Sequence, residues 1–288
     1  MAVLQALQTA GDAVRRNPVL LVAAAAFGLL QLPGLVAQSI DPLVGAVVSL
    51  GFSGIAIFVT PFFLGGILGM ANEAIDGRTS LDAFVDEGKS NYVSLLVVYF
   101  VLVAINFVLG IVGFFAAIVG GALWFSGGGG QSNLVPLAIV AAVAGVALLG
   151  YLLVVFVTQF FGHAVVVDDC EAVESLKRSA WCVRHNLLAV VGYTLLVGIG
   201  GGVFGLVAGL FSVLTTPSAA GTMGGNGVGS TPAATPLPVD LPSVGLPGTV
   251  VLVLLLLLVT GLFGGFFAAY STAFYRQIRP ASAPTTAE

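Results

Sequence analysis

The sequence predicts an all-α integral membrane protein, a bundle of six transmembrane helices. Of its 288 residues, 58% are hydrophobic and only 8% are charged, and the mean hydropathy is +1.09. These values lie far outside the balance of a soluble domain. The charged residues also leave long uncharged runs, the longest covering residues 90–167, and the basic residues occur only in alternate connections between these runs. We therefore expect lipid, not water, to surround most of the chain.

The uncharged runs convert into six spans. A spanning helix needs about 20 apolar residues, because about 30 Å of hydrocarbon is crossed at about 1.5 Å per residue. The longest run is divided by a flexible Gly-rich turn at Ser126–Asn133. We expect the first span to be retained and not cleaved as a signal peptide, because its apolar stretch is long and a second span follows at once. The predicted spans are Pro18 to about Val36, Leu43 to about Met70, Tyr92 to Phe125, Leu134 to Phe161, Asn186 to Leu214 and Pro247 to Tyr275.

The orientation follows from lysine and arginine, which stay on the cytoplasmic side during insertion. Six spans place all nine basic residues on one side, and the opposite connections around Asp41, Ser126–Asn133 and Thr215–Leu246 contain none. The basic residues are Arg15, Arg16, Arg78, Lys89, Lys177, Arg178, Arg184, Arg276 and Arg279. We therefore predict a multi-pass protein of the cell membrane with both termini in the cytoplasm.

Three segments that lead into odd-numbered spans resemble one another. When Asn17, Asn91 and Asn186 are aligned, a leucine lies ten residues earlier in each copy and a basic residue two residues earlier. The leucines are Leu7, Leu81 and Leu176, and the basic residues are Arg15, Lys89 and Arg184. The alternative is an accidental match in biased sequence. A repeat is favoured because each copy precedes a helical hairpin, and the copies would then share one orientation.

The predicted organisation is a single membrane domain over residues 1–279, made of repeats at about 1–72, 73–163 and 164–279. Each repeat is an inner amphipathic helix followed by a transmembrane hairpin. Residues 215–246 are predicted to be a flexible outer loop, because Gly, Ser, Thr and Pro dominate them, and residues 280–288 a disordered cytoplasmic tail.

The clearest inner segment is Asp168–Asn186. Asp168 with Glu171 fits a capping box, and apolar residues recur at helical spacing beside Trp181. The pattern predicts a helix in the membrane interface, where tryptophan is favoured and basic side chains reach lipid phosphate. Because the segment has few basic residues, anchoring or packing is favoured over specific lipid recognition.

The segment Glu174–Asn186, together with Phe274–Arg279 at the end of the last span, resembles the membrane domain associated with glycerophosphodiester phosphodiesterases and similar haloarchaeal membrane proteins. The resemblance implies six membrane helices. It does not imply phosphodiesterase activity, because the charged residues of the soluble catalytic barrel are missing. The pI of about 5.0 and the richness in Ala, Val and Gly also suit an archaeal source.

The residues favour few chemistries. No Asp, Glu, Lys or Arg lies inside a predicted span, and no zinc-protease, intramembrane aspartyl or nucleotide-binding motif occurs. We therefore predict no catalytic residue, metal ligand or cofactor, and no binding of nucleic acid. His163 and His185 are expected to form interfacial hydrogen bonds, and Cys170 and Cys182 to be free thiols.

Two sets of polar residues remain as candidates for a site. Asn106 and Gln159 lie inside spans and either line a cavity or form hydrogen bonds between helices. Glu73, His163, Asp168 and Asp169 form a candidate cluster at the inner face. Several Gly-x-x-x-Gly motifs are expected to pack helices within the bundle.

Three functions stay open. The first is a non-enzymatic membrane component, acting as scaffold, regulator or partner subunit, whose partners are membrane lipids and another membrane protein. The second is a facilitator or exporter of an apolar or neutral solute. The third is a lipid-active enzyme using the inner-face cluster. The oligomeric state does not follow from the sequence.

Overall fold

The computed structural model describes residues 2–29, 42–126, 134–215 and 246–280, and in these residues the chain is helical without strands. The all-α prediction is therefore confirmed for this part. The helices are α1 (Ala2–Arg16), α2 (Val19–Leu29), α4 (Pro42–Asp76), α5 (Leu81–Ser90), α6 (Tyr92–Ser126), α7 (Leu134–Thr158), α8 (Phe161–Asp168), α9 (Ala172–His185), α10 (Leu187–Thr215) and α11 (Leu246–Ile278). The predicted turn at Ser126–Asn133, the outer loop at 215–246 and the tail at 280–288 lie almost entirely outside the described residues.

Five helical segments among the described residues are long and apolar enough to cross a membrane. They are Leu43–Asp76, Tyr92–Ala122, Ala138–Asp168, Leu187–Leu206 and Val253–Ile278. Each overlaps one of the predicted spans. The first predicted span is represented by α2, whose 11 residues cover only about half of the hydrocarbon thickness. Because that span was predicted to run on into residues 30–36, which are not described, the sixth crossing stays a prediction.

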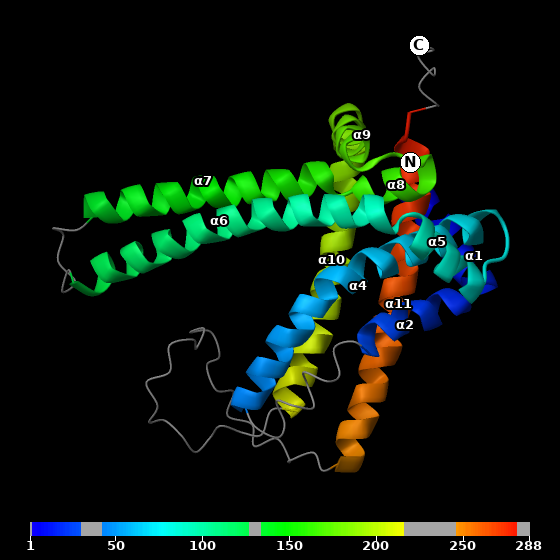
Figure 1. Ribbon diagram of the computed structural model, residues 1–288, viewed down its shortest axis with the longest axis horizontal. Helices are drawn as coiled ribbons and strands as arrows, with labels where there is room; N and C mark the ends of the chain where they lie inside the picture. The colour runs from blue at the N-terminus through cyan, green and yellow to red at the C-terminus, as the bar shows by residue number, and fades with distance from the viewer. Residues whose placement is uncertain (1, 30–41, 127–133, 216–245, 281–288) are drawn as a thin grey trace.

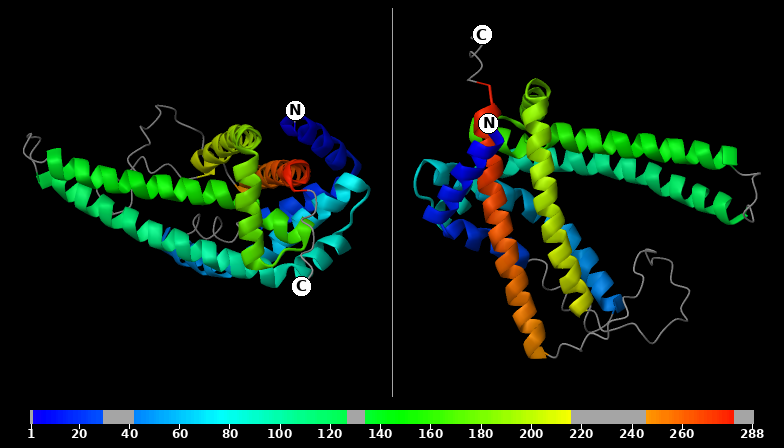
Figure 2. Two further views of the ribbon diagram at one scale, coloured as in Figure 1. Left: turned by 90° about the horizontal axis from the view of Figure 1, so that it is seen from above. Right: turned by 180° about the vertical axis from the view of Figure 1, so that it is seen from behind.

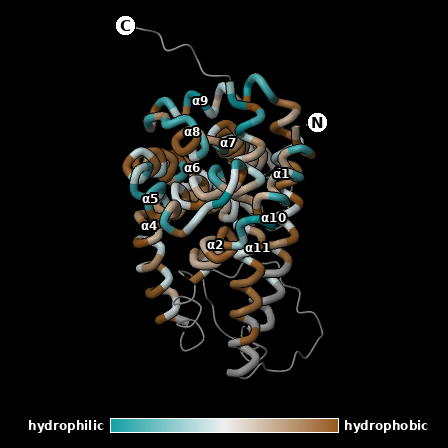
Figure 3. Tube along the Cα trace, turned by 90° about the vertical axis from the view of Figure 1, so that its right-hand side faces the viewer, coloured by the Kyte–Doolittle hydropathy of each residue, from teal (hydrophilic) through white to brown (hydrophobic). Residues whose placement is uncertain are grey.

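The short helices α1, α5, α8 and α9 gather at one end of the molecule, around the C-terminal ends of α4 and α11 (Figure 1). We call this region the polar end. Hydrophilic residues are concentrated there, and the helices that lead away from it are mostly hydrophobic (Figure 3). From the polar end, α4, α10 and α11 extend in one general direction (Figures 1 and 2).

The α6–α7 hairpin leaves the polar end in a different direction from α4, α10 and α11 (Figures 1 and 2). The arrangement of the three repeats stays a prediction. The hairpin joins the polar end through Asn91 at one side and through Gln159 and Phe160 at the other. Between its ends the hairpin carries only a few polar side chains, among them Tyr99 and Asn106, so the sequence pattern could not predict its direction.

Glycines allow two helix pairs to pack closely, as predicted for the motifs Gly65-x-x-x-Gly69 and Gly261-x-x-x-Gly265. A Cβ atom on Gly65 of α4 would lie 3.2 Å from the backbone oxygen of Glu87 in α5, and one on the adjacent Gly66 would lie 2.6 Å from that of Phe84. One on Gly261 of α11 would lie 2.7 Å from the backbone oxygen of Leu21 in α2. The prediction is wrong for α10. Cβ atoms on its glycines at 198, 201, 202, 205 and 209 would meet nothing within 4 Å, because none of the described helices packs against this face of α10.

An aromatic cluster joins the inner ends of the long helices beneath the polar end. Phe160, Tyr270 and Phe274 are fully buried, and the rings of Tyr193 and Phe274 stack with centroids 4.6 Å apart. Tyr193 belongs to α10 and Phe274 to α11. Stacked, buried rings stabilise a protein by more than their buried area alone accounts for. This cluster therefore holds α10 and α11 together next to the polar end.

Candidate functional site at the polar end

Asp168, the last residue of α8, is the centre of the polar end. Its carboxylate accepts hydrogen bonds from the hydroxyl of Tyr275 at 2.6 Å, from Nε of Arg178 at 2.8 Å and from Nη1 of Arg279 at 2.9 Å. The Asp168 side chain is only 7% exposed. Bonds between ionised partners are shorter and stronger than neutral ones. One carboxylate therefore ties α8 to α9 and to the end of α11.

The backbone turn after α8 places this carboxylate. Asp169 adopts a left-handed conformation with φ of 52°, and its backbone N–H donates to the carbonyl of Ala164. A left-handed residue is a common way to end a helix. The predicted capping box is wrong, because Glu171 is the N-cap of α9 and its side chain forms no capping hydrogen bond. Asp168 is instead turned towards the arginines.

The partners Tyr275 and Arg279 were not singled out as site residues from the sequence. They lie 107 and 111 positions from Asp168, and nothing near Asp168 in the chain indicates them. Their spacing of four residues in the C-terminal segment was the available signal, because residues four apart on a helix share a face.

The three aligned asparagines occupy equivalent structural positions. Each lies between a short helix and the apolar helix that follows, and its side-chain Nδ2 donates to the carbonyl four residues earlier. These bonds run from Asn17 to Ala13 at 3.1 Å, from Asn91 to Glu87 at 3.1 Å, and from Asn186 to Cys182 at 3.2 Å. The asparagine thus satisfies a carbonyl at the end of the short helix, where no helical partner remains.

Two of the asparagines also reach the end of the second helix of the hairpin that follows them. Asn17 Nδ2 donates to the carbonyl of Gly77 at 3.0 Å, just after α4, and Asn186 Nδ2 donates to Ile278 at 3.3 Å, the last residue of α11. Asn91 instead bonds the carboxylate of Glu87 at 3.0 Å. These shared contacts support the alignment of the three segments, and descent from a repeat stays a prediction.

Basic residues from distant segments meet at the polar end. Arg276 of α11 forms two hydrogen bonds of 3.0 Å with the carboxylate of Asp76 at the end of α4. Arg16 of α1 donates to the carbonyl of Ile75 at 3.3 Å. With Arg178 and Arg279 on Asp168, these contacts bring basic residues together at one end of the molecule, as the orientation argument requires. The side of the membrane on which they lie stays a prediction.

The four residues predicted to form a cluster at the inner face do not come together as one catalytic group. They are Glu73, His163, Asp168 and Asp169. Asp168 is occupied by its three donors, and Glu73 accepts a hydrogen bond from the hydroxyl of Thr79 at 3.0 Å. Burial, followed by the charges of Glu73 and Asp169, raises the pKa of Glu87, although its bond with Asn91 opposes the shift. No group of three or more His, Cys, Asp or Glu residues in the described residues could hold a metal ion.

The two histidines differ. His185 bonds the carbonyl of Trp181 at 2.9 Å and stacks on its ring with centroids 4.1 Å apart, which fits the predicted interfacial hydrogen bond. His163 is 6% exposed, and neither ring nitrogen has a hydrogen-bond partner in the described residues. Its ring packs beside those of Phe160 and Tyr275, with centroids 5.9 and 5.5 Å away. His163 therefore fills the core and does not make the hydrogen bond expected of it.

Cys170 and Cys182 are free and buried, as predicted for thiols without a partner. Burial raises the pKa of each thiol from its usual value to about 11. The reactive form of cysteine is the thiolate. At neutral pH both residues are therefore protonated and shielded, which makes the protein suitable for experiments with introduced cysteines.

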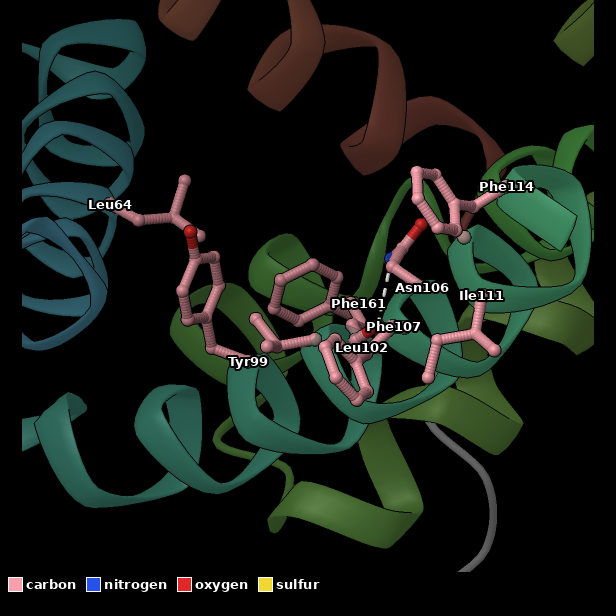
Figure 4. A pocket seen from close by; sticks show the side chains of 10 residues that line it. Leu64, Tyr99, Leu102, Asn106, Phe107, Ile111, Phe114 and Phe161 are labelled. Carbon is pink, nitrogen blue, oxygen red and sulfur yellow. Dashed lines mark hydrogen bonds between the residues drawn. The ribbon is translucent and has the colours of Figure 1, made fainter. Parts of the chain in front are cut away.

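A groove of about 840 Å³ lies between α4, α6 and α8 (Figure 4). Asn106 and Tyr99 are the polar residues along a wall that is otherwise apolar, and Leu64 of α4 and Phe161 of α8 also line the groove. Asn106 Nδ2 donates to the carbonyl of Leu102 at 2.7 Å within its own helix. Asn106 thus lies exposed along an open groove and forms no hydrogen bond with another described helix.

Gln159, the other intramembrane candidate, lies outside this groove. Its Nε2 donates to the carbonyl of Phe156 at 2.9 Å, and its Oε1 accepts from the hydroxyl of Thr194 in α10 at 3.2 Å. It forms the hydrogen bond between helices that was the alternative to a cavity.

The apolar helices and the polar end define the class of the protein as a helical membrane protein. A family model described as a domain of unknown function, DUF7847, matches residues 1–278, and the chain belongs to this family. Comparisons with curated proteins and with solved structures gave no significant match. The family match does not extend to the membrane domain associated with glycerophosphodiester phosphodiesterases, so that resemblance stays a prediction.

Proposed function

We propose that the protein is a non-enzymatic membrane component that uses its polar end to hold a partner protein. The observation that carries the proposal is the occupation of Asp168 by Arg178, Arg279 and Tyr275. The side chain of Asp168 is only 7% exposed and its two oxygens already accept three hydrogen bonds, so the carboxylate is poorly placed to contact a substrate. The carboxylate of Asp168 thus serves to hold α8, α9 and the end of α11 together.

The outer face of α5 supports a role in binding a partner. Its inner side packs tightly on α4, where a Cβ atom on Gly88 would lie 3.0 Å from the backbone oxygen of Phe62. On the outer side Leu81 is 50% and Val85 is 37% exposed, and Asp82 and Asp86 are exposed beside them. An apolar stripe flanked by acids suits a basic segment of a second membrane protein.

Photo-crosslinking in native membranes tests this proposal. A benzophenone amino acid at Val85 is expected to give a discrete protein adduct, and the adduct is expected to be lost in the double variant Asp82→Lys, Asp86→Lys. The same probe at Val97 of α6, which is 46% exposed on an apolar helix, is the matched control and should give no such adduct. Absence of a protein adduct at Val85, or an adduct that survives charge reversal, would contradict a partner at this face.

The groove supports a second candidate, a facilitator of an apolar or neutral solute. Its volume lies in the range of small-molecule sites, and Asn106 and Tyr99 provide a few polar groups along an apolar wall. Flux of a neutral solute in proteoliposomes would support this function, and a sealed vesicle without leak would oppose it. A lipid-active enzyme is the least supported candidate. Glu73 bonds Thr79, Asp168 is occupied by Arg178, Arg279 and Tyr275, and His163 is buried against aromatic rings, so these residues and Asp169 do not form one catalytic group.

A further inference from the structure

We infer that the outward face of α9 binds the headgroups of anionic phospholipids. This inference concerns lipid and does not depend on the proposed protein partner at α5. The face consists of Val173, Lys177, Trp181 and Arg184, which follow one another at spacings of four, four and three residues. Residues at these spacings lie on one side of a helix. All four are exposed, Val173 to 64% and Trp181 to 42%.

The opposite side of α9 is fixed to the rest of the protein. The hydroxyl of Ser179 donates to the carbonyl of Val157 at 2.8 Å and accepts from the backbone N–H of Phe160 at 3.1 Å. Arg178 is held by Asp168, and Asn186 anchors the end of the helix to Ile278. Because these bonds are buried or partly buried, α9 cannot rotate to hide its outward face.

The two cations on this face have no acidic partner among the described residues. Arg178 and Arg279 bond Asp168, and Arg276 bonds Asp76, whereas Lys177 and Arg184 form no ion pair in this part of the chain. Glu174 lies one turn before Lys177 and is exposed, but the two side chains are not paired. Two unpaired cations on either side of a tryptophan create a local preference for anions.

The position of α9 identifies the anion as a lipid headgroup. Only Asn186 separates α9 from the candidate span Leu187–Leu206, so Arg184 lies within one turn of the start of that span. Leu188, at the start of the span, is 92% exposed. Phosphates of a bilayer lie at this boundary, the indole ring prefers the same depth, and guanidinium binds phosphate through two parallel hydrogen bonds.

The other two junctions provide an internal comparison. Arg15 and Lys89 occupy the position of Arg184 in the aligned segments and are also exposed without an ion pair in the described residues. On α5, however, the acids Asp82 and Asp86 are exposed on the same helix as Lys89. These charges oppose an anionic headgroup, so Lys89 is the matched control for Arg184.

Fluorescence quenching by labelled lipids tests the inference. The variant Trp124→Phe leaves Trp181 as the single tryptophan of the full chain. In vesicles of phosphatidylcholine and phosphatidylglycerol, Trp181 is expected to be quenched more by a spin label near the headgroup than by one at the chain end. The same label should quench more on phosphatidylglycerol than on phosphatidylcholine. Lys177→Gln and Arg184→Gln should each reduce this preference by about fivefold, and Arg184→Lys should retain most of it.

Lys89→Gln should leave the preference unchanged. Equal quenching by the two labelled lipids in the parent protein would overturn the inference, as would an equal loss of preference in Lys89→Gln and Arg184→Gln. Quenching of Trp181 by aqueous iodide, but by neither labelled lipid, would also overturn it, because α9 would then face water.

Discussion

Replacing Asp168 by alanine is expected to lower the free energy of unfolding by about 3–5 kcal/mol, the range for breaking a buried ion pair from one side. The substitution removes the acceptor shared by Tyr275, Arg178 and Arg279, and leaves two guanidinium groups without their counter-ion. The Arg178 side chain is only 17% exposed, so water cannot replace the carboxylate fully. Chemical or thermal denaturation of the purified protein in detergent measures the loss.

Asp76→Ala is the matched control, because Asp76 also pairs with an arginine. Its side chain is 67% exposed, and exposed ion pairs contribute at most about 1 kcal/mol. Asp168→Asn should fall between the two, since an amide oxygen still accepts from Tyr275 but carries no charge. If Asp168→Ala destabilises the protein no more than Asp76→Ala does, the network around Asp168 does not hold the polar end together.

Gly66→Ala is expected to destabilise the protein by about 1–3 kcal/mol, the usual cost of overpacking a close contact. The new Cβ atom would lie 2.6 Å from the backbone oxygen of Phe84 and 2.5 Å from its ring. A flexible side chain could move away from the new Cβ atom, but the backbone of α5 cannot. The helices α4 and α5 would therefore have to separate. Denaturation in the same detergent measures the effect.

Gly201→Ala is the matched control, because it makes the same change in α10, within the motif Gly201-x-x-x-Gly205. A Cβ atom there meets nothing within 4 Å, and alanine favours a helix over glycine by about 1 kcal/mol. This variant should therefore be neutral or slightly more stable. Equal destabilisation by the two variants would mean that the face of α10 is covered by another helix.

Much of the fold followed from the distribution of charge and hydropathy. Uncharged runs predicted the long helices, because lipid excludes charge over the length of a span, and five of them are present among the described residues. The alignment of Asn17, Asn91 and Asn186 marked the three junctions correctly, because each needs the same side chain to close the short helix. Local patterns of this kind are visible in a single sequence.

Long-range contacts were not visible in the same way. Nothing in the sequence pairs Asp168 with Tyr275 and Arg279, so Asp168 was assigned to a capping box that the turn at Asp169 prevents. Gly-x-x-x-Gly occurs in α4, α10 and α11, yet only tertiary packing decides which copies meet a neighbour. The direction of the α6–α7 hairpin likewise does not follow from its own apolar pattern.

Labelling of introduced cysteines in sealed vesicles tests the one-sided arrangement of the polar end most directly. Leu4→Cys, Leu81→Cys and Val173→Cys place thiols on α1, α5 and α9 at side chains that are 65%, 50% and 64% exposed, whereas Cys170 and Cys182 are buried. An impermeant reagent should reach all three from the same side, and cysteines within 127–133 and 216–245 from the opposite side. Labelling of Leu81→Cys and Val173→Cys from opposite sides would contradict a polar end that lies on one side of the membrane.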